Sequence, residues 1–253
     1  MAIPAGFKHP WIGALKLENP VRSPHSSIET ELIRVVRRGR IEEVNVSAVA
    51  EFLSAFTKIH VDVGTGDAVF PYREAQRDPK ILCIGIDPVA ENMTKISNRI
   101  GRKPARGGVN NLLLIVANVE TIPRVLDGKA SRLTILFPWG SLLRSLVVPV
   151  PAVLMRLRAL LSDDGEFESL LNMQVFDDKS YRDRHKLPPL DVKYIEDQLS
   201  QVWTDCGLNI FIIEQYEPNK LPIRTSWGQH LTLGSNRKSI FIKARANKKI
   251  KIK

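Results

Sequence analysis

The feature that most constrains the fold is an alternation of short apolar runs with helix-forming stretches, which begins near residue 59. The apolar runs are rich in Val, Ile and Leu and cover residues 59–63, 81–86, 112–116 and 133–137. Helical patterns follow the first two runs and end near residues 77 and 100. Continuous apolar runs of this kind are typical of strands in a parallel sheet that is covered on both faces. The chain is therefore expected to form a doubly wound α/β domain.

Weaker patterns on either side complete the expected architecture. Later in the chain we expect a helix around residue 155, a strand at 167–176, a helix at 192–203, and strands at 210–213 and 240–242. Near the beginning, β-rich runs around residues 37–40 predict a β-hairpin over 31–46. A helix capped by Ser47 is expected to follow and to end near Phe56. The prediction is a mainly parallel sheet of seven strands with helices on both faces, plus the hairpin.

The positive charge of the chain is concentrated at a few places. The formal net charge is +10, and residues 237–253 contain eight Lys and Arg and no acidic residue. Further basic clusters lie at 34–40 and 99–106. Because each contact between Lys or Arg and a phosphate releases counterions, such clusters suit nucleic acid, and solvated loops are the alternative. Residues 1–30 are expected to be an irregular extension and 246–253 a basic tail.

Several classes of protein are disfavoured by the sequence. Cys83 and Cys206 lie far apart and in no motif, and the five histidines are scattered, so neither a disulfide framework nor a metal site is predicted. The N-terminus has no apolar run of the signal-peptide type, and arginines interrupt the most apolar stretch, 142–161. We therefore expect a cytoplasmic protein that does not span a membrane.

A glycine-rich turn, Gly64-Thr65-Gly66-Asp67, follows the first apolar run directly. Glycines let a backbone turn tightly and approach a ligand closely, and ligands of open α/β sheets bind at the carboxyl ends of strands. The turn does not match the dinucleotide fingerprint, because Val69 stands where a third glycine is required, and the sequence has no Gly-Lys-Ser/Thr phosphate loop. Taken alone, the turn is equally well interpreted as a plain strand–helix connection.

The next two strand ends carry residues suited to an adenosine ligand. Asp87 follows the run at 81–86, where a carboxylate can accept both hydroxyls of a ribose. It can also cap the next helix, with Pro88 as the first helical residue. The run at 112–116 is followed by Asn118, Val119 and Glu120, where an adenine ring can be held. Three such strand ends in sequence order are typical of S-adenosylmethionine binding, which the sheet class alone would not indicate.

Two tryptophans lie in loops of the second half of the chain. Trp139 stands between Pro138 and Gly140, and Trp227 lies in the long loop between the last two predicted strands. Enzymes that act on a base take it out of its stack, and aromatic faces can receive it. The two rings are therefore predicted to hold a base; the alternative is that both anchor the core beneath long loops.

At these residues the chain resembles the kanamycin–apramycin resistance type of 16S ribosomal RNA (adenine-1408-N1) methyltransferases. The runs that carry the resemblance are 61–67 (VDVGTGD), 85–92 (GIDPVAEN), 103–108 (KPARGG), 135–143 (ILFPWGSLL) and the segment 227–239. The resemblance covers about residues 31–245. It implies a Rossmann-like class I methyltransferase domain over this range, with the hairpin at its N-terminus and S-adenosylmethionine as cofactor, released as S-adenosylhomocysteine.

The resemblance also implies roles for individual residues. The cofactor-binding residues would be Asp62 and Gly64 at the methionine end, Asp87 at the ribose, Asn118, Val119 and Glu120 at the adenine, and with them Thr65, Gly66, Asp67, Pro88 and Phe137. Trp139 and Trp227 would stack on a flipped adenine, with Thr225 close to it. The residues expected to bind RNA are Arg99, Arg102, Lys103, Arg106, Arg182, Arg184, His185, Arg237 and Lys238.

Two departures from the family pattern affect the last pair. Lys238 stands where the family usually has arginine, and lysine cannot make the same planar fork to a phosphate. The loop is also one residue longer around Ser235-Asn236, so either Arg237 or Lys238 can be the contact residue.

The reaction implied is methylation of adenine N1 by a monomer acting on 16S rRNA of the 30S subunit, which confers aminoglycoside resistance. N1 already carries a lone pair, so positioning and stacking suffice without a general base. The alternatives are a tRNA (guanine-N7) methyltransferase, an RNA-binding protein on the same scaffold without turnover, and a methyltransferase for a small molecule.

Overall fold

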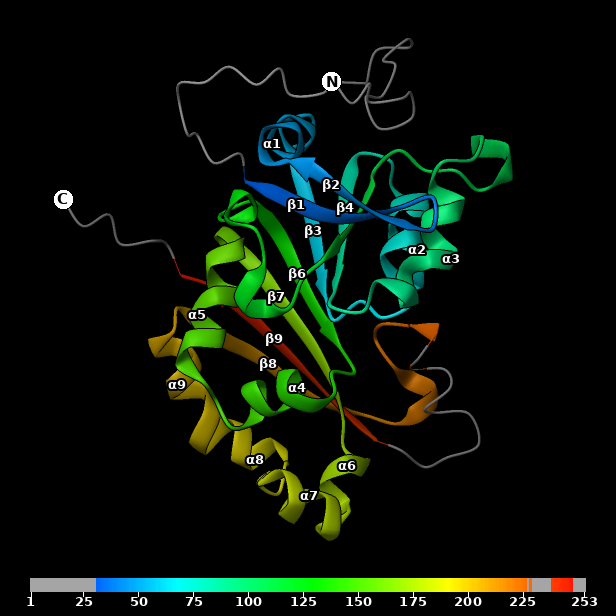
Figure 1. The fold of residues 1–253 in the computed structure, drawn as a ribbon. Helices are drawn as coiled ribbons and strands as arrows, with labels where there is room; N and C mark the ends of the chain where they lie inside the picture. Colours follow the sequence, from blue (N-terminus) through cyan, green and yellow to red (C-terminus); the bar gives the residue numbers. More distant parts are fainter. Residues whose placement is uncertain (1–30, 227, 229–237, 248–253) are drawn as a thin grey trace, which may run out of the picture.

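The apolar runs pair into one mixed β-sheet with helices on both faces, as the computed structural model shows (Figure 1). The structure describes residues 31–226, 228 and 238–247. The nine strands are β1 (Leu32–Arg37), β2 (Arg40–Asn45), β3 (Lys58–Val63), β4 (Ile81–Asp87), β5 (Leu112–Val116), β6 (Ala130–Leu136), β7 (Leu161–Asn172), β8 (Leu208–Tyr216) and β9 (Ser239–Ala246). Their order in the sheet is β2-β1-β5-β4-β3-β6-β7-β9-β8.

The sheet is larger and less parallel than the sequence predicts. Parallel pairing joins β5, β4, β3, β6 and β7, whereas β1–β2, β1–β5, β7–β9 and β8–β9 are antiparallel. Nine strands replace the expected seven because β1 pairs with β5, at Val35 and Ile115, and so brings β1 and β2 into the same sheet. The description "mainly parallel" is therefore corrected to a mixed sheet.

Two layers of helices cover the sheet. The main helices are α1 (Val46–Ser54), α2 (Val69–Arg77), α3 (Ala90–Ile100), α4 (Gly140–Val147), α5 (Pro151–Leu160), α7 (Lys179–His185) and α9 (Ser200–Asp205). Shorter pieces are α6 (Gln174–Asp177), α8 (Val192–Tyr194), the 3₁₀ turns η1 (Pro104–Arg106), η2 (Val119–Thr121), η3 (Arg124–Leu126) and η5 (Pro218–Lys220), and the π-helical η4 (Ile195–Leu199). Helices α2 and α3 pack beside β4 and β5, and α5 and α9 cover the opposite face (Figure 1).

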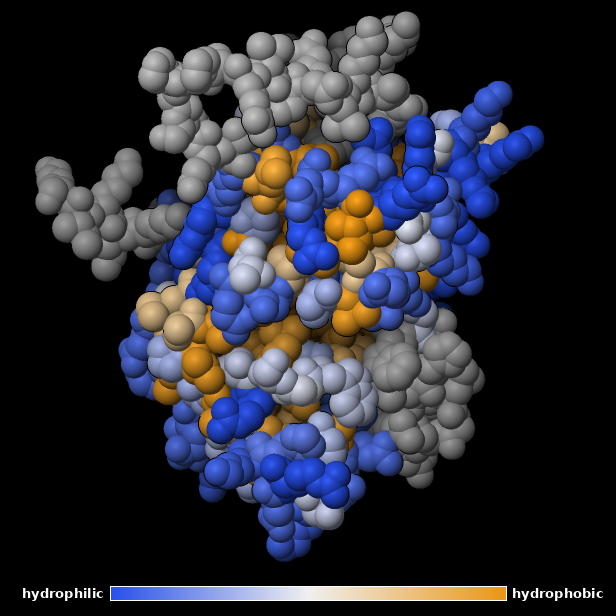
Figure 2. Space-filling model, in the orientation of Figure 1, coloured by the Kyte–Doolittle hydropathy of each residue, from blue (hydrophilic) through white to orange (hydrophobic). Residues whose placement is uncertain are grey.

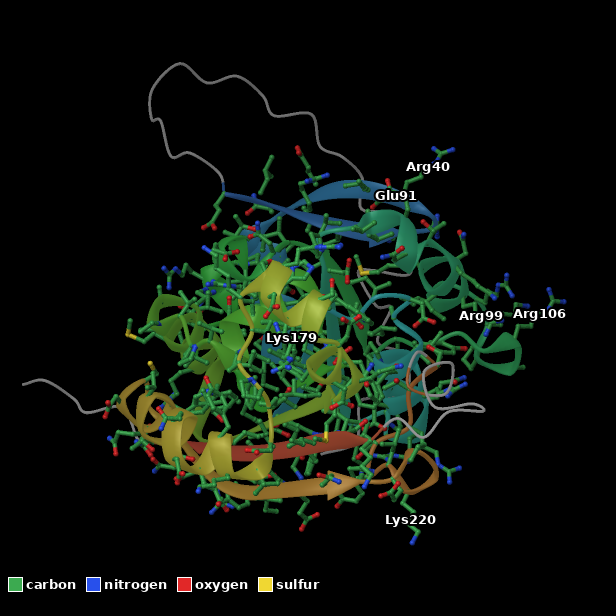
Figure 3. The ribbon with its side chains drawn as sticks, turned by 90° about the horizontal axis from the view of Figure 1, so that it is seen from below. Arg40, Glu91, Arg99, Arg106, Lys179 and Lys220 are labelled. Carbon is green, nitrogen blue, oxygen red and sulfur yellow. The ribbon has the colours of Figure 1, made fainter. Side chains whose placement is uncertain are left out.

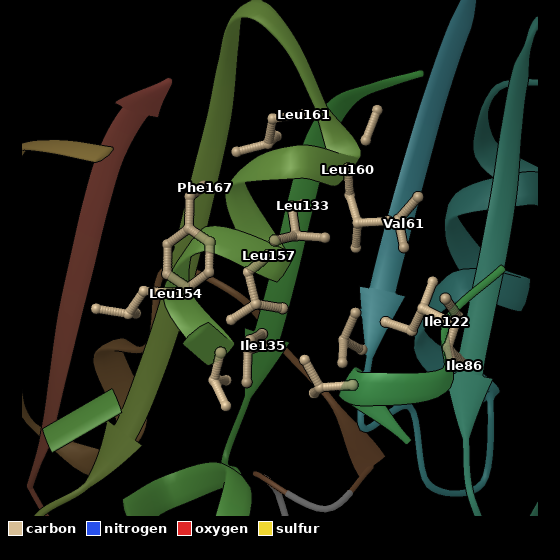
Figure 4. Close-up of a cluster of buried hydrophobic side chains, with 14 of the residues drawn as sticks. Val61, Ile86, Ile122, Leu133, Ile135, Leu154, Leu157, Leu160, Leu161 and Phe167 are labelled. Carbon is tan, nitrogen blue, oxygen red and sulfur yellow. The ribbon is translucent and has the colours of Figure 1, made fainter. Parts of the chain in front are cut away.

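The largest core lies under α5 and α9. Leu154 and Leu157 of α5 are fully buried together with Leu133 and Ile135 of β6, as Figure 4 shows. Phe167 meets Trp203 edge to face, with ring centroids 5.1 Å apart. Burial of a large apolar side chain stabilises a fold by about 1.5–3 kcal/mol, so this face anchors the strands that carry the site.

Helices α1 and α3 begin at other residues than the sequence predicts. Asn45, not Ser47, caps α1: its Oδ1 accepts a hydrogen bond from Ser47 N at 3.1 Å. Helix α3 begins at Ala90, so Pro88 is not its first residue.

The predicted strand 167–176 and helix 192–203 also need correction. Strand β7 ends at Asn172, whose Oδ1 accepts from Gln174 N and starts the helical turn of α6. The predicted helix at 192–203 is three consecutive pieces, α8, the π-helical η4 and α9.

Within the described chain, no single helix is long and apolar enough to cross a membrane. By length and composition, α4 and α5 pass such a test only as a pair, and they are bent by 98° relative to each other.

Candidate active site

A cavity of about 580 Å³ lies at the edge of the sheet where the parallel strands β3, β4, β5 and β6 end. All of the residues predicted for the cofactor line it: Asp62, Gly64, Thr65, Gly66, Asp67, Asp87, Pro88, Asn118, Val119, Glu120 and Phe137. Trp139 and Thr225 line it as well, whereas Trp227 lies outside the described residues. A volume of this size is ordinary for a small-molecule site.

The glycine-rich turn is tied to the neighbouring strand. Gly64 N and Thr65 N both donate to Ile86 O, at 2.8 and 3.0 Å. Gly64 and Gly66 have φ of +74° and +56°, a region that side chains disfavour, which explains why glycines stand here. A Cβ on Gly66 would meet nothing within 4 Å, so the turn leaves open space on the cavity side.

Asp87 holds this turn by a hydrogen bond and keeps lone pairs that can accept hydrogen bonds from a ligand. Its Oδ2 accepts from Gly66 N and its Oδ1 from Val89 N, both at 2.9 Å. The side chain is buried yet lines the cavity. Because each carboxylate oxygen has two lone pairs, each can accept a further hydrogen bond. The N-cap of α3 is Val89 and makes no side-chain capping bond, so the predicted capping role of Asp87 is wrong, whereas its capacity to accept from a ligand remains.

Asp62 is the most deeply buried acid at the cavity. It is 3% exposed, and burial raises its pKa to about 6, although a hydrogen bond from Thr134 lowers the pKa. A cationic ligand beside this carboxylate would stabilise its ionised form and lower its pKa.

The third strand end is shaped by Asn118. Its Oδ1 accepts from Thr121 N and Thr121 Oγ1, at 3.0 and 2.8 Å, which closes the turn η2. The buried Val119 and the exposed Glu120 then line the cavity from this turn. The side-chain oxygen of Asn118 therefore holds the turn that positions Val119 and Glu120 at the cavity. The sequence did not reveal this role.

The opposite wall comes from the loops after β6 and β8. Phe137 has φ of +53° and its N donates to Leu170 O at 2.7 Å, so β7 holds it in an unfavourable conformation. Trp139 is 44% exposed, which excludes a core-anchor role for this ring. Thr225 is buried, and its Oγ1 accepts from Gly228 N at 2.8 Å.

A hydrogen bond joins the two walls. Ser226 Oγ donates to Asp67 Oδ2 at 2.7 Å, while Asp67 Oδ1 accepts from Val69 N. Sequence reasoning missed Ser226, as it missed Ser141 and Ser145 of α4, which also line the cavity. Helix α4 itself was not predicted, and the partner of Ser226 is 159 residues away, so no local signal was available.

The predicted RNA-binding residues fall into separate groups on the surface. Arg99, Arg102, Lys103 and Arg106 are exposed at the end of α3 and in the turn after it. The hairpin tip lies beside them, because Gly39 N donates to Ser97 Oγ at 2.9 Å. Figure 3 shows Arg40, Arg99 and Arg106 projecting from the same side of the molecule.

The second group, Arg182, Arg184 and His185, belongs to helix α7. Arg184 and His185 are exposed, Arg182 is half-buried, and the His185 ring lies 4.2 Å from that of Tyr181. Lys238 is exposed and pairs with Glu217 at 3.2 Å, and Arg237 lies outside the described residues.

Figure 2 shows apolar surface near the middle of the face, with hydrophilic side chains above and below it.

Within the described part of the chain, no three His, Cys, Asp or Glu side chains are grouped so as to hold a metal ion. Both cysteines are free and buried.

Comparison with known proteins gives one consistent result. The profile of a family described as "NpmA: 16S rRNA (adenine(1408)-N(1))-methyltransferase" matches residues 34–246. An Escherichia coli protein named 16S rRNA (adenine(1408)-N(1))-methyltransferase is 27% identical over 80% of this chain and 94% of its own length. A protein of the same name from Streptoalloteichus tenebrarius is 30% identical over 78% of this chain and 91% of its own length.

Solved structures agree. The antibiotic-resistance methyltransferase Kmr is similar with a TM-score of 0.72 and 40% identity, over 85% of this chain and 99% of its own. A 16S rRNA (adenine(1408)-N(1))-methyltransferase variant from Catenulisporales acidiphilia, crystallised with its cosubstrate SAM, has a TM-score of 0.78 and 28% identity, over 86% of this chain and 98% of its own.

Proposed function

Because the chain belongs to the family of 16S rRNA (adenine(1408)-N(1))-methyltransferases, we propose that it methylates N1 of adenine 1408 in 16S rRNA with S-adenosylmethionine. The observation that carries the proposal is that the ends of β3, β4 and β5 and the exposed ring of Trp139 line one cavity. We place the catalytic unit in residues 31–245, with the class I sheet in β3 to β9 and the hairpin of residues 31–46 added to its edge.

The strand-end half of the cavity fits S-adenosylmethionine, which supplies a methyl group on a sulfonium. Asp87 has free acceptor capacity for the two ribose hydroxyls, and the open glycine turn lets the backbone approach the ligand. Asp62 supplies a negative charge for the cationic methionine end. Val119 and Glu120 border the adenine.

The opposite half receives the target base. Trp139 and Trp227 stack on the flipped adenine, and Thr225 stands close to it. N1 of adenine carries its own lone pair, so the residues need only hold it in line with the methyl group. The product base is cationic, and the negative face of a tryptophan ring favours the charge as it develops.

Docking on folded rRNA uses the basic surfaces. The hairpin tip and residues 99–106 form one patch, and the basic residues of α7 and Lys238 add exposed positive charge elsewhere on the surface. Patches of this kind contact phosphates and read the shape of the RNA. We propose that a monomer acts on the 30S subunit in the cytoplasm, and that the methyl group blocks the edge of the base that aminoglycosides contact.

Primer extension tests the proposal. A methyl group on N1 stops reverse transcriptase, so 16S rRNA from cells that express the protein should give a new stop at adenine 1408. Rising aminoglycoside tolerance should accompany that stop. A Trp139→Ala variant is the matched control, since it keeps the strand-end half of the cavity. Transfer of labelled methyl to tRNA and not to 30S subunits would replace this function with the guanine-N7 alternative, and transfer to neither would indicate a silent scaffold.

A further inference from the structure

A chain of three buried polar side chains runs behind the cavity. His60, Thr134 and Asp62 are exposed by only 3%, 0% and 3%. Asp62 and Thr134 face each other in the parallel ladder of β3 and β6, and His60 precedes Asp62 by two residues on the same face of β3. Within the described chain, the cavity lining includes Asp62 but neither Thr134 nor His60. The two hidden residues can therefore act on a ligand only through Asp62.

The hydrogen bonds of this chain have a defined direction. Thr134 Oγ1 lies 2.5 Å from Asp62 Oδ1 and 3.0 Å from His60 Nε2. An ionised carboxylate can only accept, so the single hydroxyl proton of Thr134 is donated to Asp62. The Thr134 oxygen must then accept from His60, which places a proton on Nε2 of that ring.

Burial keeps the histidine neutral in this role. It holds the pKa of His60 well below its ordinary value, and the charges of Arg132 and Arg77 lower the pKa further. The ring also meets Phe70 edge to face, with centroids 5.6 Å apart, which fixes its orientation. A neutral, immobile donor of this kind orients the Thr134 hydroxyl without adding a charge.

The titratable groups that face Asp62 come from three strands. His60 is its neighbour on β3, Arg132 on β6 favours the ionised carboxylate, and Asp87 on β4 disfavours it. Arg132 is itself held by Glu168 and Glu74, at 2.6 and 3.0 Å. Against the strong cost of burial, the hydrogen bond from Thr134 is the largest effect that keeps Asp62 ionised.

We propose that Thr134 and His60 are positioning residues that hold the Asp62 carboxylate ionised and in one orientation for the cationic methionine end of S-adenosylmethionine. The inference rests on the contact between Asp62 and the cofactor given under the proposed function. The hydrogen bond from Thr134 holds Oδ1 of Asp62 on the side away from the cavity. The carboxylate therefore has one rotamer before the ligand binds. A ligand that binds a prepared site loses less conformational entropy and binds more tightly.

Calorimetric titration with S-adenosylmethionine between pH 5 and 8 tests the proposal without requiring turnover. In the unchanged protein, affinity should rise as the pH passes through about 6, because the cation favours ionised Asp62. Thr134→Val keeps the shape but removes the hydroxyl, and should lower affinity at pH 7.5 roughly tenfold, as expected for a hydrogen bond to a charged group. It should also move the midpoint of the pH profile upward. Thr134→Ser should restore both.

Asp62→Asn separates this inference from the function on which it rests. If Asp62→Asn leaves the affinity unchanged, the contact between Asp62 and the cofactor is wrong. If Asp62→Asn weakens binding while Thr134→Val has the affinity and pH midpoint of the unchanged protein, the positioning role alone is overturned.

A measurement on the unchanged protein covers the case in which Thr134→Val does not fold. Nitrogen chemical shifts of the His60 ring should show the neutral form protonated at Nε2 at pH 7.5, where Asp62 is ionised. A ring protonated at Nδ1, or one that becomes cationic near pH 6.5, would contradict the proposed direction of the hydrogen bonds.

Discussion

The two walls of the cavity are built in different ways. The strand-end wall, formed by the turns after β3, β4 and β5, is closed by hydrogen bonds from Gly64 N to Ile86 O and from Gly66 N to the Asp87 carboxylate. The opposite wall, formed by the loops after β6 and β8, presents the exposed ring of Trp139 and a side-chain hydrogen bond of Thr225. The first wall is therefore organised before any ligand arrives, and the second offers a surface for a partner. This contrast fits the proposal that the cofactor binds at the first wall and the target base at the second.

Removing the carboxylate of Asp87 should have the largest effect, and only on the first wall. Asp87→Ala deletes the acceptor of two bonds from backbone N–H groups and the proposed acceptor of the ribose hydroxyls. Affinity for S-adenosylmethionine should fall by roughly 10- to 150-fold, the equivalent of about 1.5–3 kcal/mol for hydrogen bonds to a charged group. Calorimetry measures the loss. The affinity of Asp87→Asn, which keeps one acceptor oxygen, should lie between those of the unsubstituted protein and Asp87→Ala. An unchanged dissociation constant would remove Asp87 from the cofactor site.

Removing the ring of Trp139 should affect only the second wall. Stacking of a base on an aromatic ring is worth about 1–3 kcal/mol, so Trp139→Ala should reduce kcat/KM for 30S subunits by roughly 5- to 150-fold. Cofactor affinity should remain unchanged, and Trp139→Phe should recover part of the activity. The assignment of the walls would be wrong if this variant lost cofactor affinity and kept its activity on RNA.

The contrast also explains how much of the site could be read from the sequence. The first wall consists of apolar runs each followed at once by a turn, so Gly64 and Asp87 could be placed from local patterns. Trp139 was placed at the site by the family resemblance, with Pro138 and Gly140 on either side as the local signal. By contrast, the hydrogen bond between Thr134 and Asp62 spans 72 residues and leaves no local signal.

The same limit applies to the fold. The seven runs of the central sheet have their own apolar patterns, whereas the pairing of β1 with β5 is a non-local contact. Helix α4 was not predicted, although Pro149 and Pro151 mark the break between its residues 140–147 and those of α5 in the sequence itself.

Two glycines offer a matched test of moderate size, one from each wall. Gly66 and Gly140 have φ of +56° and +58°, and a Cβ on either would meet nothing within 4 Å. Substitution by alanine should therefore lower the free energy of unfolding by the same amount, about 1–2 kcal/mol for a left-handed residue. Gly66 lines the cavity, so only Gly66→Ala should also weaken S-adenosylmethionine binding. Chemical denaturation and calorimetry measure the two effects, and equal losses of cofactor affinity would contradict the difference between the walls.

The bond between Ser226 and Asp67 should give the smallest effect and the sharpest test, because it is the contact that joins the walls. Ser226→Ala removes one hydrogen bond of about 0.5–1.5 kcal/mol, so kcat/KM for 30S subunits should fall by roughly 2- to 12-fold. Cofactor affinity alone should change little, since Asp67 keeps its bond to Val69 N.

A double-mutant cycle with Asp67→Ala separates this contact from unrelated losses. If the bond carries the effect, the two substitutions together should cost no more than the larger single one, and the coupling energy should be near 1 kcal/mol. Strictly additive losses in kcat/KM would mean that the walls act independently. The loop of Ser226 would then be held beside the base by the hydrogen bond between Gly228 N and Thr225 Oγ1 and by the packing of Ile223 and Phe137. The hydrogen bond to Asp67 would not contribute to its position.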